Sequence, residues 1–189
     1  MQTMKNSILL KITLTPIICV LVIMSTQIGI EYYPLSFGLV IGFMNWNNYK
    51  YGLFIGIILS LLASYFSFFI AYFTVYLLVE IFNSILGQDT GGVTALLVSS
   101  FIIAPLLMFY LYKFVFNYSR TKVTNYIILY AVIILIIISY LFYYFTDYKF
   151  VRFLKRIRLD HYTIWQIVMA LGIQLIIYQK EIWNKQKLE

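Results

Sequence analysis

Long apolar runs separated by short polar stretches dominate this chain of 189 residues. One run, residues 123–145, contains no charged residue. About 20 apolar residues cross a bilayer as a helix, and in hydrocarbon every backbone polar group must be bonded inside the protein. A transmembrane barrel would instead show short segments that alternate polar and apolar residues. The pattern therefore predicts an all-α integral membrane protein, with residues 1–189 forming a single polytopic transmembrane domain.

Four spans are predicted directly from these runs, at residues 12–30, 93–113, 123–146 and 162–178, with Pro105 inside the second. The region from residue 34 to residue 82 is harder to divide. Residues 34–46 are apolar but short, so they either cross the membrane or form a re-entrant segment. Residues 51–82 would form a helix of about 48 Å, longer than the ~30 Å hydrocarbon core, and must tilt, kink or project.

Basic residues decide between five and six spans, because cytoplasmic loops of membrane proteins are enriched in Lys and Arg. Six spans with a cytoplasmic N-terminus place nine basic residues inside and five outside, whereas five spans place seven on each side. The nine are Lys5, Lys11, Lys50, Lys113, Arg120, Lys122, Lys180, Lys185 and Lys187, and the five are Lys149, Arg152, Lys155, Arg156 and Arg158. We therefore expect a bundle of about six transmembrane helices in the cell inner membrane, with both termini cytoplasmic and five spans as the alternative.

Small residues recur at steps of four in two of the expected helices. Such residues hold helices together in membranes, because they let two backbones approach closely. We expect these positions to pack helices, either within the chain or in a homo-oligomer. They are Gly38 and Gly42 in the short segment, and Gly52, Gly56, Ser60 and Ser64 in the long one.

Residues 149–158 predict a short basic amphipathic helix that lies in the membrane interface before the last span. Phe150, Phe153, Leu154 and Ile157 share its apolar face, while Val151 fits that face imperfectly. The opposite face is cationic and suits anionic lipid head groups or an acidic partner. The candidate contact residues are Lys149, Arg152, Lys155, Arg156, Arg158 and His161.

Composition narrows the chemistry further. Charged residues make up only 11% of the chain, and the formal net charge is +7. In a membrane protein such an excess sets orientation and attracts anionic lipid, so no direct nucleic-acid binding is expected. Cys19 is the single cysteine and cannot form an internal disulfide.

The sequence shows no catalytic constellation. It contains no metal-ligating cluster and no nucleophile–base pair, and the stretch of residues 89–92, which we interpret as a turn, lacks the Lys-Ser/Thr of a phosphate-binding loop. Arg156 and His161 form an Arg-x4-His that resembles the motif of the higher-eukaryote-and-prokaryote nucleotide-binding ribonucleases, over six residues only. We expect neither enzymatic activity nor a cofactor.

Gln166 and Gln174 lie on one face of the last span, where glutamines either bind helices together or mark a functional site.

The layout of a short second span, an Asn-rich turn and a long glycine-containing third span resembles the substrate-binding subunits of energy-coupling-factor vitamin transporters. That resemblance implies a non-enzymatic membrane subunit for solute binding or solute/ion passage. Those subunits dock to their partner through Ala-x-x-x-Ala on the first helix, whereas residues 12–30 contain no Ala. Residues 34–56 are also similar to membrane-embedded sensor domains. The alternative is therefore an accessory or regulatory membrane protein, such as a sensor, immunity or antiviral-defence component, that acts through a partner or a pore.

Overall fold

The computed structural model describes residues 2–26, 29–156 and 159–183, and helices joined by short connections make up this part of the chain. The prediction of an all-α protein is confirmed. In chain order the elements are α1 (Gln2–Thr26), η1 (Ile30–Tyr32), α2 (Tyr33–Met44), η2 (Trp46–Asn48), α3 (Leu53–Leu86), α4 (Gln88–Val98), the π-helix η3 (Ser99–Ile103), α5 (Ala104–Val115), α6 (Lys122–Tyr144), α7 (Lys149–Arg156), α8 (His161–Ile177) and α9 (Gln179–Trp183).

Four stretches of the described chain are long and apolar enough to cross a membrane: Ile8–Ser25, Leu53–Leu86, Thr90–Val115 and Lys122–Tyr144. Three of them match the predicted long spans closely. The first helix begins at Gln2 and ends at Thr26, so the predicted range of 12–30 was too late at both ends. The remaining apolar helices, α2 and α8, have 12 and 17 residues.

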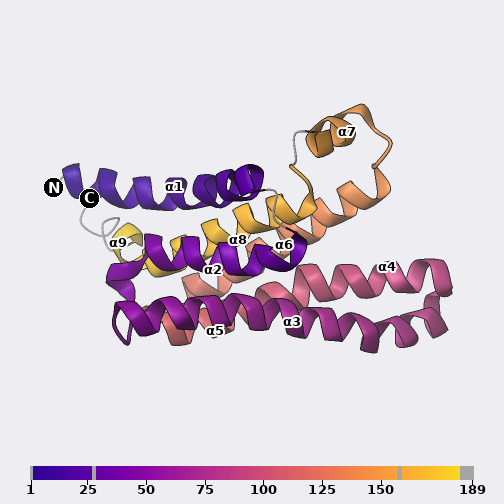
Figure 1. Ribbon diagram of the computed structural model, residues 1–189, viewed down its shortest axis with the longest axis horizontal. Coiled ribbons are helices and arrows are strands. Elements are labelled where there is room, and N and C mark those ends of the chain that lie inside the picture. The colour runs from indigo at the N-terminus through magenta and orange to yellow at the C-terminus, as the bar shows by residue number, and fades with distance from the viewer. Residues whose placement is uncertain (1, 27–28, 157–158, 184–189) are drawn as a thin grey trace.

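Residues far apart in the sequence meet at one end of the bundle. The Asn117 amide donates to the Asn48 carbonyl at 2.8 Å, and the Asn48 side chain donates to the Tyr178 hydroxyl at 3.0 Å. The Lys11 ammonium group lies 5.7 Å from the centre of the Tyr178 ring. Figure 1 shows the start of α1 beside α9 at this end, with α7 toward the other. We call it the basic end, since it carries Lys11, Lys50, Lys113, Arg120, Lys122 and Lys180.

The two short apolar helices, α2 and α8, are more enclosed by protein than the four long stretches. α8 buries nine of its 17 residues and α2 buries six of its 12. The four long stretches are only 28–39% buried and expose large apolar side chains such as Phe54, Leu77 and Ile85. Exposed apolar surface of this extent is typical of contact with lipid. The short helices are largely surrounded by protein, so their length need not match the thickness of the bilayer.

The backbones of α2 and α3 touch at Gly38. A Cβ atom at Gly38 would lie 2.9 Å from the Ser60 carbonyl oxygen and 3.0 Å from the Leu61 Cα and the Ser64 Oγ. The Ser60 hydroxyl donates to the Gly38 carbonyl at 2.8 Å. Gly38, Ser60 and Ser64 therefore lie at a close helix contact within the chain, where small residues allow two backbones to approach.

The other glycines among the predicted packing residues have different structural roles. A Cβ at Gly56 would lie 2.2 Å from the Tyr49 ring, and one at Gly42 would lie 2.6 Å from the Tyr49 hydroxyl. The absence of a side chain at both glycines thus leaves room for Tyr49. The Tyr49 ring stacks on that of Phe116, with the ring centres 5.2 Å apart. Gly52 precedes α3 and is exposed, and its φ of 81° is a conformation that glycine adopts readily. The six small residues therefore do not form one continuous groove for a second helix.

The turn predicted at residues 89–92 is wrong. The chain turns two residues earlier, at Gly87, which has a φ of 85°, and α4 begins at the next residue. A Cβ at Gly91 would lie 2.5 Å from the Asn83 backbone nitrogen. Gly91 is therefore needed where α4 approaches α3, and not for a turn of its own.

The contact at Gly38 predicts a stability difference between two glycine-to-alanine variants. Gly38→Ala would place its methyl group against α3 backbone, and overpacking of this kind costs about 1–3 kcal/mol. Gly92→Ala in α4 is the matched control, because no atom lies within 4 Å of its Cβ position. Thermal unfolding in detergent is expected to show a lower melting temperature for Gly38→Ala only. Equal melting temperatures would contradict a tight α2–α3 contact.

Candidate solute-binding cavity

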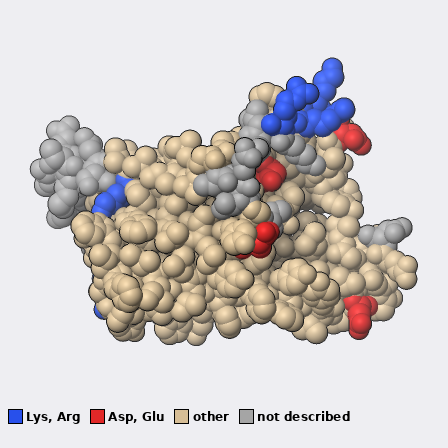
Figure 2. Space-filling view, in the orientation of Figure 1, with Lys and Arg blue, Asp and Glu red and all other residues tan. Residues whose placement is uncertain are grey.

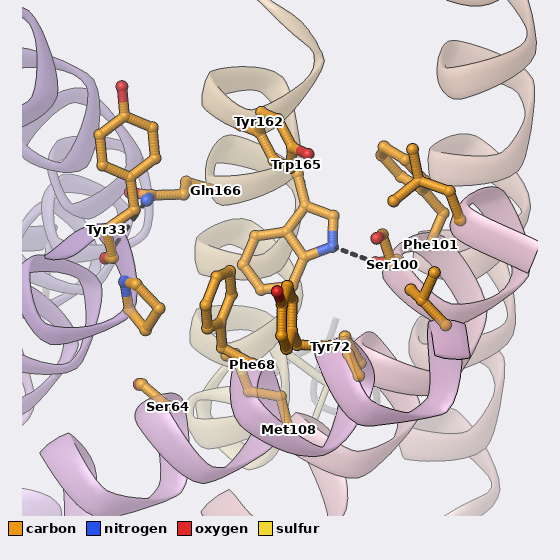
Figure 3. Close-up of a pocket in the computed structure, with 15 residues that line it drawn as sticks. Tyr33, Ser64, Phe68, Tyr72, Ser100, Phe101, Met108, Tyr162, Trp165 and Gln166 are labelled. Atoms are coloured by element: carbon orange, nitrogen blue, oxygen red, sulfur yellow. Dashed lines mark hydrogen bonds between the residues drawn. The ribbon is translucent and has the colours of Figure 1, made fainter. Parts of the chain in front are cut away.

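A cavity of about 240 Å³ lies among α2, α3, α4, η3, α5 and α8 (Figure 3). All 15 described residues that line it are uncharged, and most are aromatic or aliphatic. The most exposed of them, Tyr72 and Leu96, lie on α3 and α4. The lining residues are Tyr33, Pro34, Ser64, Phe68, Ala71, Tyr72, Val75, Leu96, Ser100, Phe101, Ala104, Met108, Tyr162, Trp165 and Gln166.

A proline produces the π-helix that forms one wall of the cavity. The Ala104 amide donates to the Ser99 carbonyl, five residues back, in place of the Ser100 carbonyl four residues back. The next residue, Pro105, has no N–H to donate. The Ser100 carbonyl is therefore available, and the Trp165 indole donates to it at 3.0 Å (Figure 3). This bond holds the Trp165 ring against the cavity, and π-helical turns inside α-helices are frequent at functional sites.

Hydroxyl groups meet at the inner end of the cavity. The fully buried Tyr112 places its hydroxyl 2.7 Å from the Ser64 Oγ and 3.2 Å from the Ser60 Oγ. Ser64 also lines the cavity, so it links this cluster to the cavity wall. Further toward the basic end, Tyr49 packs against α2 and α3, and burial raises the pKa of its phenol to about 12. The Tyr49 phenol is therefore neutral at physiological pH.

Gln166 supplies a second polar group. Its side chain is turned toward α2 (Figure 3), and its Nε2 donates to the Tyr33 carbonyl at 3.4 Å. Gln166 is 3% exposed, and its Oε1 is buried without a hydrogen-bond partner in the described part of the chain. An unpaired buried acceptor of this kind costs about 1–3 kcal/mol, which a bound donor would recover. Gln174, two turns further along the same face, is fully buried.

The predicted cationic residues lie away from the cavity. Figure 2 shows basic side chains gathered at a projecting corner of the molecule. This corner is α7, where Lys149, Arg152 and Arg156 are exposed. Lys155 belongs to the same helix, and Arg158 lies outside the described residues. α7 rests on the bundle differently from the prediction, because Val151 is only 6% exposed and Phe153 is 54% exposed.

His161 is the first residue of α8 and is partly buried among aromatic rings. The centre of its ring lies 4.1 Å from that of Tyr162 and 6.0 Å from that of Phe101. Both aromatic residues line the cavity, so His161 lies beside it without being part of its lining. Arg156 lies on the exposed side of α7, whereas His161 lies among aromatic rings at the start of α8.

The sequence did not reveal the cavity, because its residues come from separate helices. Two residues stood out in the sequence, but the sequence did not show which residues they contact. Pro105 within an apolar span marks the π-helix, and Gln166 within the last span marks the polar side of the cavity. The partners of both, Trp165 and Tyr33, are ordinary aromatic residues in a chain with 18 Tyr and 16 Phe.

Comparison with protein families, with curated proteins and with solved structures finds no match for this chain. Its function is therefore inferred from its own residues.

The hydroxyl cluster predicts a difference between two tyrosines of α5. Tyr112→Phe would remove the hydroxyl that contacts Ser60 and Ser64, at a cost of about 1–2 kcal/mol. Such a loss lowers the melting temperature by roughly 2–8 °C in a protein of this size. Tyr110→Phe changes an exposed side chain and should leave the melting temperature unchanged within about 2 °C. Thermal unfolding of both variants in the same detergent measures the difference, and equal values would show that the cluster contributes nothing.

Proposed function

We propose that this chain is a non-enzymatic polytopic membrane protein that binds a small neutral solute in the cavity, as a solute-binding or solute-passage subunit. The supporting observation is the cavity itself, which is walled by six elements and lined by 15 uncharged residues. Ligand sites are typically concave, mostly apolar and supplied with a few polar groups that orient the ligand. The cavity volume of about 240 Å³ lies just below the range of roughly 300–1,000 Å³ that is typical of ligand pockets, which suits a small molecule of roughly one or two rings.

The lining also indicates the chemistry of the solute. A charged ligand would lose its hydration without gaining a counter-charge, which is strongly unfavourable in an apolar environment. A neutral apolar molecule avoids that cost. A hydroxyl or amide on it could donate to the Gln166 Oε1, which is buried and unpaired within the described chain. Tyr72 and Leu96, at the exposed side of the lining, are surrounded by apolar surface of the kind that faces lipid, so we propose entry from the bilayer.

We further propose six spans with both termini cytoplasmic. Support comes from α2 and α8, which run in the same direction across the bundle. The first turn of α2 lies beside the first half of α8, because the Gln166 side chain donates to the Tyr33 carbonyl. The chain just after α2 lies beside the end of α8, because the Asn48 side chain donates to the Tyr178 hydroxyl. If α8 crosses the membrane, α2 therefore crosses it too. The basic residues of the basic end then lie on the cytoplasmic side, as the orientation rule for Lys and Arg requires.

Quenching of Trp165 by 4-bromophenol tests the cavity as a binding site. This neutral probe combines one apolar ring with one hydroxyl. In a Trp46→Phe, Trp183→Phe background Trp165 is the sole tryptophan of the chain. Binding in the cavity is expected to give saturable quenching, whereas probe dissolved in detergent gives quenching that rises in proportion to its concentration.

Two variants locate the saturable quenching. Ala104→Leu fills the cavity and should abolish it, and Gln166→Leu should weaken the apparent affinity by about 5–10-fold through loss of one hydrogen bond. Leu106→Val, close by on α5 but outside the lining, is the matched control and should bind like the parent protein. Quenching that is unsaturable, or identical in all variants, would overturn the binding site and favour an accessory protein that acts through a partner.

A further inference from the structure

The level of α7 in the membrane is indicated by the tyrosines before it. Tyr140, Tyr143 and Tyr144 at the end of α6, and Tyr148 just after it, are 46–63% exposed. Exposed tyrosines gather where the hydrocarbon core meets the head groups. α7 begins at the residue after Tyr148 and lies across the end of α6 (Figure 1). We therefore expect the helix to lie near the level of the lipid phosphates.

The outer side of α7 is cationic. Lys149, Arg152 and Arg156 are exposed, and Figure 2 shows the basic side chains of this corner standing clear of the uncharged surface around them. Two carboxylates flank the helix in sequence. Asp160 is occupied as the N-cap of α8, where the Thr163 amide donates to it at 2.8 Å. Asp147 and Asp160 together carry two negative charges against the three cations of the helix, so this corner retains a net positive charge.

An apolar groove runs beneath the same helix. It has a volume of about 370 Å³ and lies between the second half of α6, α7 and the start of α8. Its walls include Ile138, Leu141 and Phe142 from α6, Val151 and Leu154 from α7, and Ile164 from α8. The groove thus follows α6 from the level of the tyrosines toward the middle of the membrane.

We propose that this corner binds an anionic phospholipid, with the phosphate held by Lys149, Arg152 and Arg156 and one acyl chain lying in the groove. An amphiphile with a negative head and an apolar tail matches both parts of the site at the depth that the tyrosines indicate. The flexible Lys and Arg side chains can extend around the helix to phosphates at its flanks. Guanidinium groups suit phosphate oxygens because they donate two parallel hydrogen bonds.

The site is separate from the solute cavity, since the two linings share no residue. The lipid site also accounts for the position of α7. In the six-span arrangement this cationic helix lies on the outer side of the membrane, which carries fewer basic residues than the cytoplasmic side. A bound anionic lipid would neutralise charge that the orientation rule otherwise disfavours there.

Native mass spectrometry of the detergent-purified full chain tests this lipid site, with phosphatidylglycerol and phosphatidylcholine as probes. The wild-type protein should retain phosphatidylglycerol at least about tenfold more than phosphatidylcholine. The variant Lys149→Gln, Arg152→Gln, Arg156→Gln should lose most of this preference. The matched control removes three cations from the basic end, by Lys50→Gln, Lys113→Gln and Lys180→Gln, and should keep the preference.

A second pair of variants tests the groove. Ile138→Trp would fill it and should lower retention of phosphatidylglycerol, whereas Ile137→Trp adds the same ring at an exposed neighbouring position and should not. If the glutamine variant fails to fold, Arg152→Lys with Arg156→Lys keeps the charge and should retain the lipid at reduced affinity. Displacement by glycerol phosphate alone would show that a free phosphate suffices and would overturn the acyl-chain part of the site. Equal loss in the α7 and basic-end variants would overturn the site as a whole.

Discussion

The backbone contact between α2 and α3 at Gly38 is the constraint on which the rest of the bundle depends. A helix of 12 residues is only about 18 Å long and cannot cross a ~30 Å hydrocarbon core by itself. Held against α3, it buries six of its 12 residues in protein. The same contact places Tyr33 and Pro34 at the cavity, and it brings Ser60 and Ser64 of α3 within reach of Tyr112. A bulkier residue at position 38 would therefore disturb packing and cavity together.

Hydrogen bonds between helices satisfy polar groups that would otherwise be left unbonded in hydrocarbon. Pro105 interrupts the regular hydrogen bonding of its helix, and Trp165 of α8 satisfies the carbonyl that is released. Thr121 and Thr124 at the start of α6 both donate to the Gln179 side chain at the basic end. The groups left unpaired are few and buried, and one of them, the Gln166 Oε1, belongs to the cavity. Polar groups thus hold the helices together, and one of the acceptors left unpaired in the described chain lies at the space available to a solute.

Much of the helical architecture could be predicted from the sequence, because in a bilayer a long apolar run has few structures available to it. Residues 123–146 were placed within two residues of α6 at both ends. The spacing marked both Gly38 and Gly56 as packing positions, but spacing alone could not tell that Gly56 faces the Tyr49 ring and Gly38 the backbone of α3. The cavity could not be predicted, because Tyr33, Phe68 and Trp165 meet only through tertiary packing. The orientation of α7 was also missed in part, since Val151 faces the groove through contacts with α6 and α8 that no local pattern contains.

The crossing of the membrane by α2 is tested most directly by labelling cysteines at its two ends. In a Cys19→Ala background, Tyr32→Cys and Asn47→Cys each introduce one exposed thiol, before and after the helix. A membrane-impermeant maleimide added to intact cells should label Tyr32→Cys at once, and Asn47→Cys only after the membrane is permeabilised. Labelling of both positions from outside would show that α2 does not cross, and would contradict the six-span bundle.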